Sequence, residues 1–107
     1  MAEFEITAQE LKARLDKGDD LFILDVREPA EYAVCKLNGS TLIPLGEVAK
    51  RLNELDNSRE IVVHCKLGGR SAKAVDILRS AGFQKVKNLV GGIDGWAQKV
   101  DPTMPRY

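Results

Sequence analysis

The sequence predicts an α/β protein in which a parallel β-sheet carries helices on both of its faces. Short apolar runs at residues 21–26 and 60–65 alternate with segments whose apolar residues recur at helical spacing. Turn residues separate the two kinds of segment, and no internal repeat or linker interrupts them. Alternation of strands and helices along a chain is typical of a parallel sheet covered by helices.

The first elements are predicted from local signals. Thr7 and Glu10 form a capping-box pattern, and apolar residues at helical spacing follow until Gly18, which predicts a helix. The apolar run at residues 21–26 predicts a strand buried on both faces. A second, short strand is expected at residues 40–44, which end in a proline.

The central and later elements follow the same alternation. One apolar stripe predicts a helix over residues 45–55, and "EIVVHC" predicts a buried strand. A helix ended by Gly82, a short strand over "KVKNL" and a final helix starting near the glycine pair come next. We expect Trp96 in the core and an irregular tail at residues 101–107, because two prolines cannot lie inside a helix.

Length and composition define the class of protein. The 107 residues suit one domain, 1–107, with a core at about residues 4–100. Sixteen acidic and sixteen basic residues balance, which argues against nucleic-acid binding. The apolar runs are too short to span a membrane, the N-terminus lacks the pattern of a signal peptide, and two cysteines make no disulfide framework. We therefore expect a cytoplasmic protein.

The segment around Cys65 has the features of an anion-binding loop. It runs from a strand end to a helix start, where backbone N–H groups lack partners and the helix dipole is positive. Gly68 and Gly69 allow a tight curl, and Lys66 and Arg70 add positive charge. Lowering a thiol pKa by about two units requires about 2.7 kcal/mol. The dipole supplies about 0.3–1 kcal/mol, so hydrogen bonds of about 1.5–3 kcal/mol each must supply the rest.

A lone cysteine is more often an inert core residue than a nucleophile. Here the cysteine precedes two glycines, an arginine and a helix start, and this combination favours a functional thiol.

Four segments of the chain together resemble the rhodanese-like sulfurtransferases. They are "ILDVREPAEY", "NGSTLIPL", "VVHCKLGGRSAKAVDILRSAGF" and "LVGGIDGWAQKV", in the family's order and spacing. The resemblance implies a five-stranded parallel sheet, no cofactor, and a persulfide on Cys65 that passes its sulfur to a nucleophilic acceptor. Thiosulfate would be a small donor. The persulfide cradle would consist of Lys66, Leu67, Gly68, Gly69 and Arg70, and Ser71 would open the supporting helix.

One branch of that family is similar in "CKLGGRS" and in the ending "GWAQKVDPTMPRY". It is the rhodanese domain at the C-terminus of the adenylyltransferase/sulfurtransferase proteins that activate molybdopterin synthase. This resemblance implies a cysteine desulfurase as donor and a ubiquitin-like sulfur carrier as acceptor. The chain would be either a domain of a larger protein or a stand-alone relative. Lys36 departs from the family pattern, which often has a histidine there.

Other polar residues have simpler interpretations. Asp25 and Arg27 match the family's D-x-R pattern, and we expect an ion pair or loop-anchoring hydrogen bonds, with support of the site as the alternative. His64 should point away from Cys65, since neighbours on a strand face opposite sides. Cys35 is either a thiol that resolves a persulfide or a small buried side chain. No metal site is expected from one histidine and two distant cysteines.

Two other functions compete with sulfur transfer. Phosphatases of the dual-specificity cell-cycle type resemble this fold but have five residues between cysteine and arginine, whereas "CKLGGR" has four. The shorter loop should suit one sulfur atom and crowd a phosphate. The second competitor is a non-catalytic binding module, which loss of the cysteine would mark most clearly, and Cys65 is present.

Overall fold

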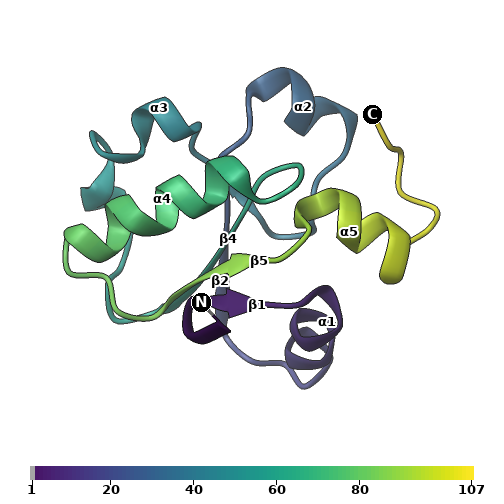
Figure 1. Cartoon of the computed structure of the whole chain (residues 1–107), viewed down its shortest axis with the longest axis horizontal. Helices are drawn as coiled ribbons and strands as arrows, with labels where there is room; N and C mark the ends of the chain where they lie inside the picture. Colours follow the sequence, from purple (N-terminus) through teal and green to yellow (C-terminus); the bar gives the residue numbers. More distant parts are fainter. Residues whose placement is uncertain (1) are drawn as a thin grey trace.

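The computed structural model describes residues 2–107 and has a central sheet of five parallel strands (Figure 1). All neighbouring strands pair in parallel. In spatial order the strands are β1 (Glu5–Ile6), β5 (Val86–Leu89), β4 (Glu60–His64), β2 (Leu21–Asp25) and β3 (Thr41–Leu42). This arrangement confirms the predicted parallel sheet.

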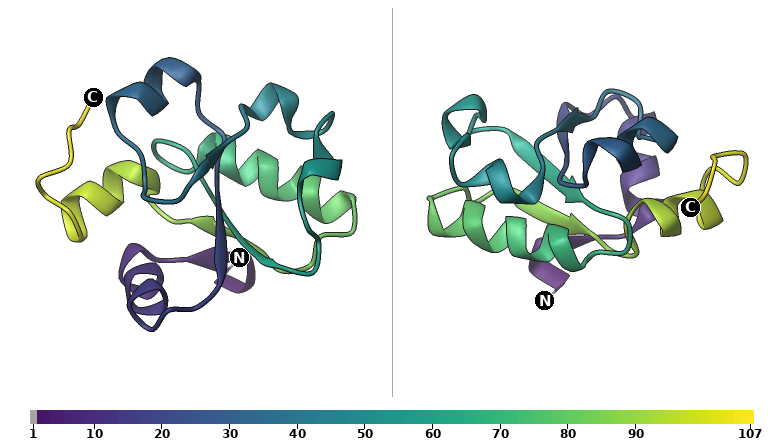
Figure 2. Two further views of the ribbon diagram at one scale, coloured as in Figure 1. Left: turned by 180° about the vertical axis from the view of Figure 1, so that it is seen from behind. Right: turned by 90° about the horizontal axis from the view of Figure 1, so that it is seen from above.

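Helices cover both faces of this sheet, as predicted (Figures 1 and 2). Helices α1 (Ala8–Asp16) and α5 (Gly92–Lys99) pack on one face. Helices α3 (Leu45–Val48) and α4 (Gly69–Ser80) pack on the other. Within residues 2–107, no helix combines the length and apolar character needed to cross a membrane.

The core has two halves because successive strand residues face opposite sides of the sheet. In β4, Ile61 and Val63 join the cluster that includes α3 and α4, and Cys65 continues the same alternation. Val62 joins the cluster with α1 and α5. Trp96 belongs to this second cluster and is 8% exposed, which confirms its predicted place in the core. The sheet therefore directs the Cys65 thiol towards the α4 side.

The predicted capping box at the start of α1 is present. The Thr7 hydroxyl oxygen accepts a hydrogen bond from the Glu10 backbone N–H at 3.1 Å. The Glu10 carboxylate accepts from the Thr7 backbone N–H at 2.9 Å. Two donors that the helix leaves unpaired are thereby satisfied, so the first helix begins where the sequence pattern predicts.

The prediction of one continuous helix over residues 45–55 is wrong. The segment forms α3, which ends after four residues, and a separate 3-10 turn at Leu52–Glu54. Arg51, between the two, has φ −118° and ψ 23°, so the chain does not continue as a helix from one to the other. The four apolar residues of the stripe nevertheless all pack against the same core cluster. Two short turns present them to that cluster as well as one helix would, so the spacing alone could not distinguish the two structures.

Three short elements were not predicted individually, and one of them is the 3-10 turn at Ala2–Phe4. Strand β1 has two residues, which is too short for a periodic pattern. Helix α2 (Pro29–Val34) has no buried residue and so carries no apolar stripe. Its signal was Pro29 at the first helical position, where the fixed φ and the missing N–H are tolerated. The chain after Asp101 contains only turns and bends, and it returns alongside α5 towards α2 (Figure 1).

Candidate functional site

The polar residues that follow β2 and β4 meet at the carboxyl edge of the sheet. The two strands are neighbours, and Asp25 lies opposite His64 in their register. Asp25 and Arg27 follow one strand, and the Cys65 loop follows the other. In open α/β sheets this edge is where ligands bind. The fold thus brings the two predicted groups of residues to one place.

The loop after β4 curls around the Cys65 sulfur. Helix α4 begins at Gly69, two residues before the predicted opening at Ser71, and Gly68 is its N-cap. The Gly68 backbone N–H donates a hydrogen bond to Cys65 Sγ at 3.0 Å. Gly68 has φ +123°, a conformation that side-chain-bearing residues rarely adopt. Glycine is therefore needed at this position to orient the N–H group towards the sulfur. The neighbouring Leu67 side chain is 64% exposed.

Ser71 and Asn88 form a second support for the loop. The Ser71 hydroxyl lies 3.4 Å from Cys65 Sγ and 2.5 Å from the Asn88 side-chain oxygen, within hydrogen-bond distance of both. The Asn88 amide group donates to the Gly68 carbonyl oxygen at 3.2 Å. Because serine has one hydroxyl proton, it donates either to Asn88 or to the thiolate. Sequence analysis missed Asn88, whose signal was a polar residue inside the short strand β5.

The surroundings of Cys65 favour its anion. The residue is 2% exposed, and burial by itself raises a thiol pKa. Hydrogen bonding from Ser71, through its hydroxyl and its backbone N–H, acts in the opposite direction, as do the backbone N–H groups of Gly68 and Leu67. The balance lowers the pKa of Cys65 below its ordinary value. Thiolate is the nucleophilic form of cysteine, so the loop prepares a nucleophile.

The first turn of α5 supports the backbone of this loop. Ile93 N–H donates to the Cys65 carbonyl oxygen at 2.9 Å, and Asp94 N–H donates to the Lys66 carbonyl oxygen at 3.0 Å. Gly92 has φ +59°, and a Cβ atom there would lie 2.7 Å from the Cys65 carbonyl oxygen and closer still to that of Lys66. Only glycine fits this approach. The sequence analysis used the glycine pair as a helix start and missed this role.

Arg70 lies in the first turn of α4, next to the loop, and forms an ion pair with Glu31 of α2. Its two terminal nitrogens donate to the two carboxylate oxygens of Glu31 at 2.6 and 2.9 Å. Hydrogen bonds from Arg70 lower the pKa of Glu31 to about 2, and the same pair raises the pKa of Arg70. The cation that we expected in the persulfide cradle is thus paired with a carboxylate from α2.

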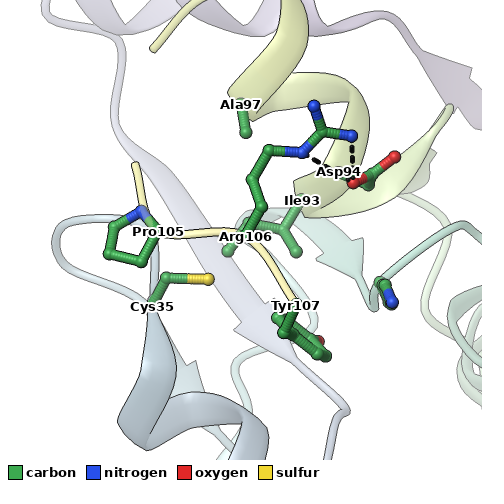
Figure 3. A pocket seen from close by; sticks show the side chains of 8 residues that line it. Cys35, Ile93, Asp94, Ala97, Pro105, Arg106 and Tyr107 are labelled. Carbon is green, nitrogen blue, oxygen red and sulfur yellow. Dashed lines mark hydrogen bonds and ion pairs between the residues drawn. The ribbon is translucent and has the colours of Figure 1, made fainter. Parts of the chain in front are cut away.

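The last residues of the chain lie over this edge. Tyr107 accepts a hydrogen bond from Arg27 Nη1 at 2.9 Å and donates to Glu31 at 2.8 Å. The Lys66 ammonium lies 4.5 Å from the centre of the Tyr107 ring, a cation–π distance. Figure 3 shows Tyr107 beside a small hollow that Cys35, Pro105 and Arg106 also line. No pattern in the sequence indicated this contact.

Asp25 and Arg27 form a fully buried ion pair, the arrangement that we expected. Arg27 Nη2 and Nε donate to Asp25 at 2.7 and 3.0 Å. Burial opposes the charge of Arg27, but hydrogen bonds with Asp25 and Tyr107 raise its pKa. Burial lowers the pKa of His64, which favours its neutral form, and its Nε2 lies 3.6 Å from Asp25. These groups anchor the strand ends and do not contact the Cys65 sulfur.

Both cysteines are free thiols. Cys35 is the C-cap of α2, and Arg27 Nη2 donates to its carbonyl oxygen at 2.7 Å. In the part of the chain that the structure describes, no three His, Cys, Asp or Glu side chains gather closely enough to hold a metal ion.

A family model and similar known proteins agree on the family of this chain. The model of the rhodanese-like domain matches residues 7–99. YrkF of Bacillus subtilis strain 168, whose name describes a sulfur carrier protein, is 42% identical over 97 residues, which are 91% of this chain and 52% of YrkF. The adenylyltransferase and sulfurtransferase MOCS3 of Arabidopsis thaliana is 34% identical over 99% of this chain and 26% of its own length.

Solved structures agree with these sequence relatives. The crystal structure of a rhodanese-like domain protein from Staphylococcus aureus superposes with a TM-score of 0.82 and 33% identity, covering 86% of this chain and 89% of that one. The chain spans about half the length of YrkF and about a quarter of that of MOCS3. The family match, by contrast, extends over nearly all of this chain. The chain therefore belongs to the rhodanese-like domain family.

Proposed function

We propose that the protein is a sulfurtransferase that carries sulfane sulfur as a persulfide on Cys65. The observation that carries this proposal is the Gly68 N–H that donates to Cys65 Sγ at 3.0 Å at the start of α4. The lowered pKa of the thiol supports it, because the thiolate is the attacking form. Membership of the rhodanese-like family, which includes proteins named as sulfurtransferases, supports the reaction type.

With thiosulfate as donor, the Cys65 thiolate attacks the outer sulfur atom. A bond forms between the two sulfurs, the sulfur–sulfur bond of thiosulfate breaks, and sulfite leaves with its electron pair. The product is a Cys65 persulfide anion. An acceptor such as cyanide then attacks the terminal sulfur, thiocyanate leaves, and the Cys65 thiolate is restored. The N–H groups of the loop stabilise the negative sulfur at both stages, and no proton or external electron is required.

The physiological partners are part of the proposal. A cysteine desulfurase is a suitable protein donor, and a ubiquitin-like sulfur carrier in molybdopterin or thio-modification pathways is a suitable acceptor. Support comes from relatives whose names describe sulfur carriers and adenylyltransferase/sulfurtransferases. A reducing compartment such as the cytoplasm fits two free thiols.

The decisive test locates the transferred sulfur. After incubation with thiosulfate, mass spectrometry of peptides should find one extra sulfur on the peptide containing Cys65. The peptide containing Cys35 is the internal control and should remain unmodified. Cys65→Ser should remove the extra sulfur and abolish thiocyanate formation, since serine cannot form a persulfide, while circular dichroism stays unchanged.

Two outcomes would contradict the proposal. Thiocyanate formation by Cys65→Ser at the wild-type rate would show that Cys65 is not the carrier. Hydrolysis of an aryl phosphate by the wild type, without sulfur transfer, would favour a phosphatase, and the absence of both activities would favour a binding module.

A further inference from the structure

The carboxylate of Glu31 is paired with the guanidinium of Arg70, the cation at the rim of the Cys65 loop. The two terminal nitrogens of Arg70 donate to its carboxylate at 2.6 and 2.9 Å, a bidentate pair. The side chains are partly shielded from water, with 19% of Glu31 and 36% of Arg70 exposed. Solvent screens such a pair less than one on the open surface. Glu31 therefore neutralises the positive charge of Arg70, which is then not available to attract an anionic ligand to the loop.

The carboxylate of Glu31 is held from two further directions. The Glu28 backbone N–H donates to Oε1 at 2.9 Å, and the Tyr107 hydroxyl donates to Oε2 at 2.8 Å. Tyr107 is itself held by Arg27, whose Nη1 donates to its hydroxyl oxygen at 2.9 Å. Three donor groups thus fix one carboxylate, and a ligand that replaced it on Arg70 would leave the other two donors without their partner.

The pair lies within the electrostatic reach of the nucleophile. Arg70 lies in the first turn of α4, whose N-cap residue Gly68 donates to Cys65 Sγ at 3.0 Å. The negative charge of the Cys65 thiolate is accordingly one of the influences that raise the pKa of Arg70. An anionic donor that approaches Cys65 consequently meets a neutral pair and a fixed carboxylate instead of a free guanidinium. Lys66 remains as a cation of the loop, with its ammonium over the Tyr107 ring.

We propose that Glu31 is a specificity-determining residue, which disfavours small dianions such as thiosulfate and favours donors whose sulfur is flanked by groups without net negative charge. This inference rests on the proposed sulfurtransferase function and specifies its donor class. Like charges close to one another oppose binding, and the fixed position of the carboxylate keeps that repulsion at the rim of the loop.

Alkylation of Cys65 tests the charge selection without any sulfur transfer. Iodoacetate and iodoacetamide react alike but differ by one negative charge, so the ratio of their rates reports how the site treats anions. We expect Glu31→Gln to raise the iodoacetate-to-iodoacetamide ratio, followed on the Cys65 peptide by mass spectrometry, about fivefold. A change in the Cys65 pKa affects both reagents equally and cancels in the ratio.

Glutamine has the shape of glutamate and can still accept the bond from the Glu28 N–H. The matched control is Glu28→Gln, which removes the same charge from the start of the same helix. Within residues 2–107, Glu28 has no hydrogen bond or ion pair with Arg70. We therefore expect the iodoacetate-to-iodoacetamide ratio of Glu28→Gln to stay within twofold of the wild-type ratio. A rise of equal size in both variants would assign the effect to general charge and overturn the proposal.

The sulfur-transfer assay supplies the second measurement. Glu31→Gln should lower KM for thiosulfate about fivefold and leave kcat within twofold, because the carboxylate does not contact the reacting sulfur. Failure of the proposed function would appear as a wild type without sulfur transfer, whatever the alkylation ratio. Failure of the present inference would appear as sulfur transfer by the wild type with a ratio and KM that Glu31→Gln leaves unchanged.

A second variant keeps the test valid if Glu31→Gln does not fold. Tyr107→Phe removes one donor from the carboxylate and retains the ring beneath Lys66. We expect it to raise the iodoacetate-to-iodoacetamide ratio about twofold. An unchanged ratio in each variant that folds overturns the assignment of Glu31.

Discussion

The two cysteines of this protein lie at opposite ends of two helices, and their surroundings differ accordingly. Cys65 precedes α4, where the Gly68 N–H points at its sulfur from 3.0 Å. Cys35 is the C-cap of α2, where its own N–H bonds back to the helix and its carbonyl oxygen accepts from Arg27. Helix starts attract negative charge and helix ends repel it. The same side chain is thus a prepared nucleophile in one place only.

The cation beside Cys35 does not compensate for this difference. Arg27 Nη1 lies 3.9 Å from Cys35 Sγ, but the guanidinium is already paired with Asp25 in the core. At Cys65, by contrast, the Gly68 backbone N–H donates to the sulfur itself. The comparison shows that backbone geometry, more than neighbouring charge, distinguishes the two thiols.

The largest loss of stability and of sulfur transfer should come from substitution of Gly92, which supports the Cys65 loop. Gly92→Ala puts a Cβ atom into the backbone of Cys65 and Lys66 and forces a residue with φ +59° to carry a side chain. We expect the free energy of unfolding to fall by about 1–3 kcal/mol from the backbone conformation alone. Sulfur transfer should fall at least tenfold, because the loop must move.

Gly95→Ala is the matched control for this substitution. Gly95 lies in the same helix, and an added Cβ would make only an ordinary contact, at 3.7 Å from the Val90 carbonyl oxygen. Urea denaturation and thiocyanate formation, measured on both variants, separate the two positions. Equal effects at Gly92 and Gly95 would show that α5 does not support the loop in the way described.

A smaller effect should follow from removing the hydroxyl beside Cys65. Ser71→Ala takes away a hydrogen bond that favours the thiolate, so the pKa of Cys65 should rise towards its ordinary value. One hydrogen bond to a charged group corresponds to about one pH unit. Less thiolate is then present at pH values below the new pKa of Cys65, and activity should fall more at pH 6 than at pH 9.

The rate of iodoacetamide alkylation against pH measures this shift directly. Ser80→Ala, at the exposed far end of α4, is the control and should leave the midpoint unchanged. If the midpoint of Ser71→Ala also stays in place, the backbone N–H groups alone account for the lowered pKa. The comparison with Cys35 would then rest on backbone geometry entirely.

The smallest effect is expected at the other thiol. Cys35→Ser should keep sulfur transfer within about twofold of the wild type, because its sulfur receives no backbone donor among the hydrogen bonds of residues 2–107. The serine hydroxyl can also bond within the partly polar surroundings of Arg27. A loss comparable to that of Cys65→Ser would show that Cys35 takes part, for example by resolving the persulfide.

Much of the fold and part of the site were predictable because they depend on neighbours along the chain. The capping box of α1, the buried strands β2 and β4 and the glycine loop after Cys65 all have local signals. The five-strand count came from the resemblance to a family, since β1 has only two residues. The segment at residues 45–55 shows the limit, because one apolar spacing fits both a helix and two short turns.

What only the tertiary structure decided is which side chains complete the site. Glu31 meets Arg70 across 39 positions of sequence and Tyr107 across 76 positions, and Ser71 meets Asn88 across 17. The period of a helix or strand shows only which nearby residues of the same element share a face, so it carries no information about such distant pairs. Packing of the helices and the tail against one sheet edge creates them. The amino-acid sequence by itself thus indicated the candidate nucleophile and its loop, whereas the folded chain determined the charges that surround them.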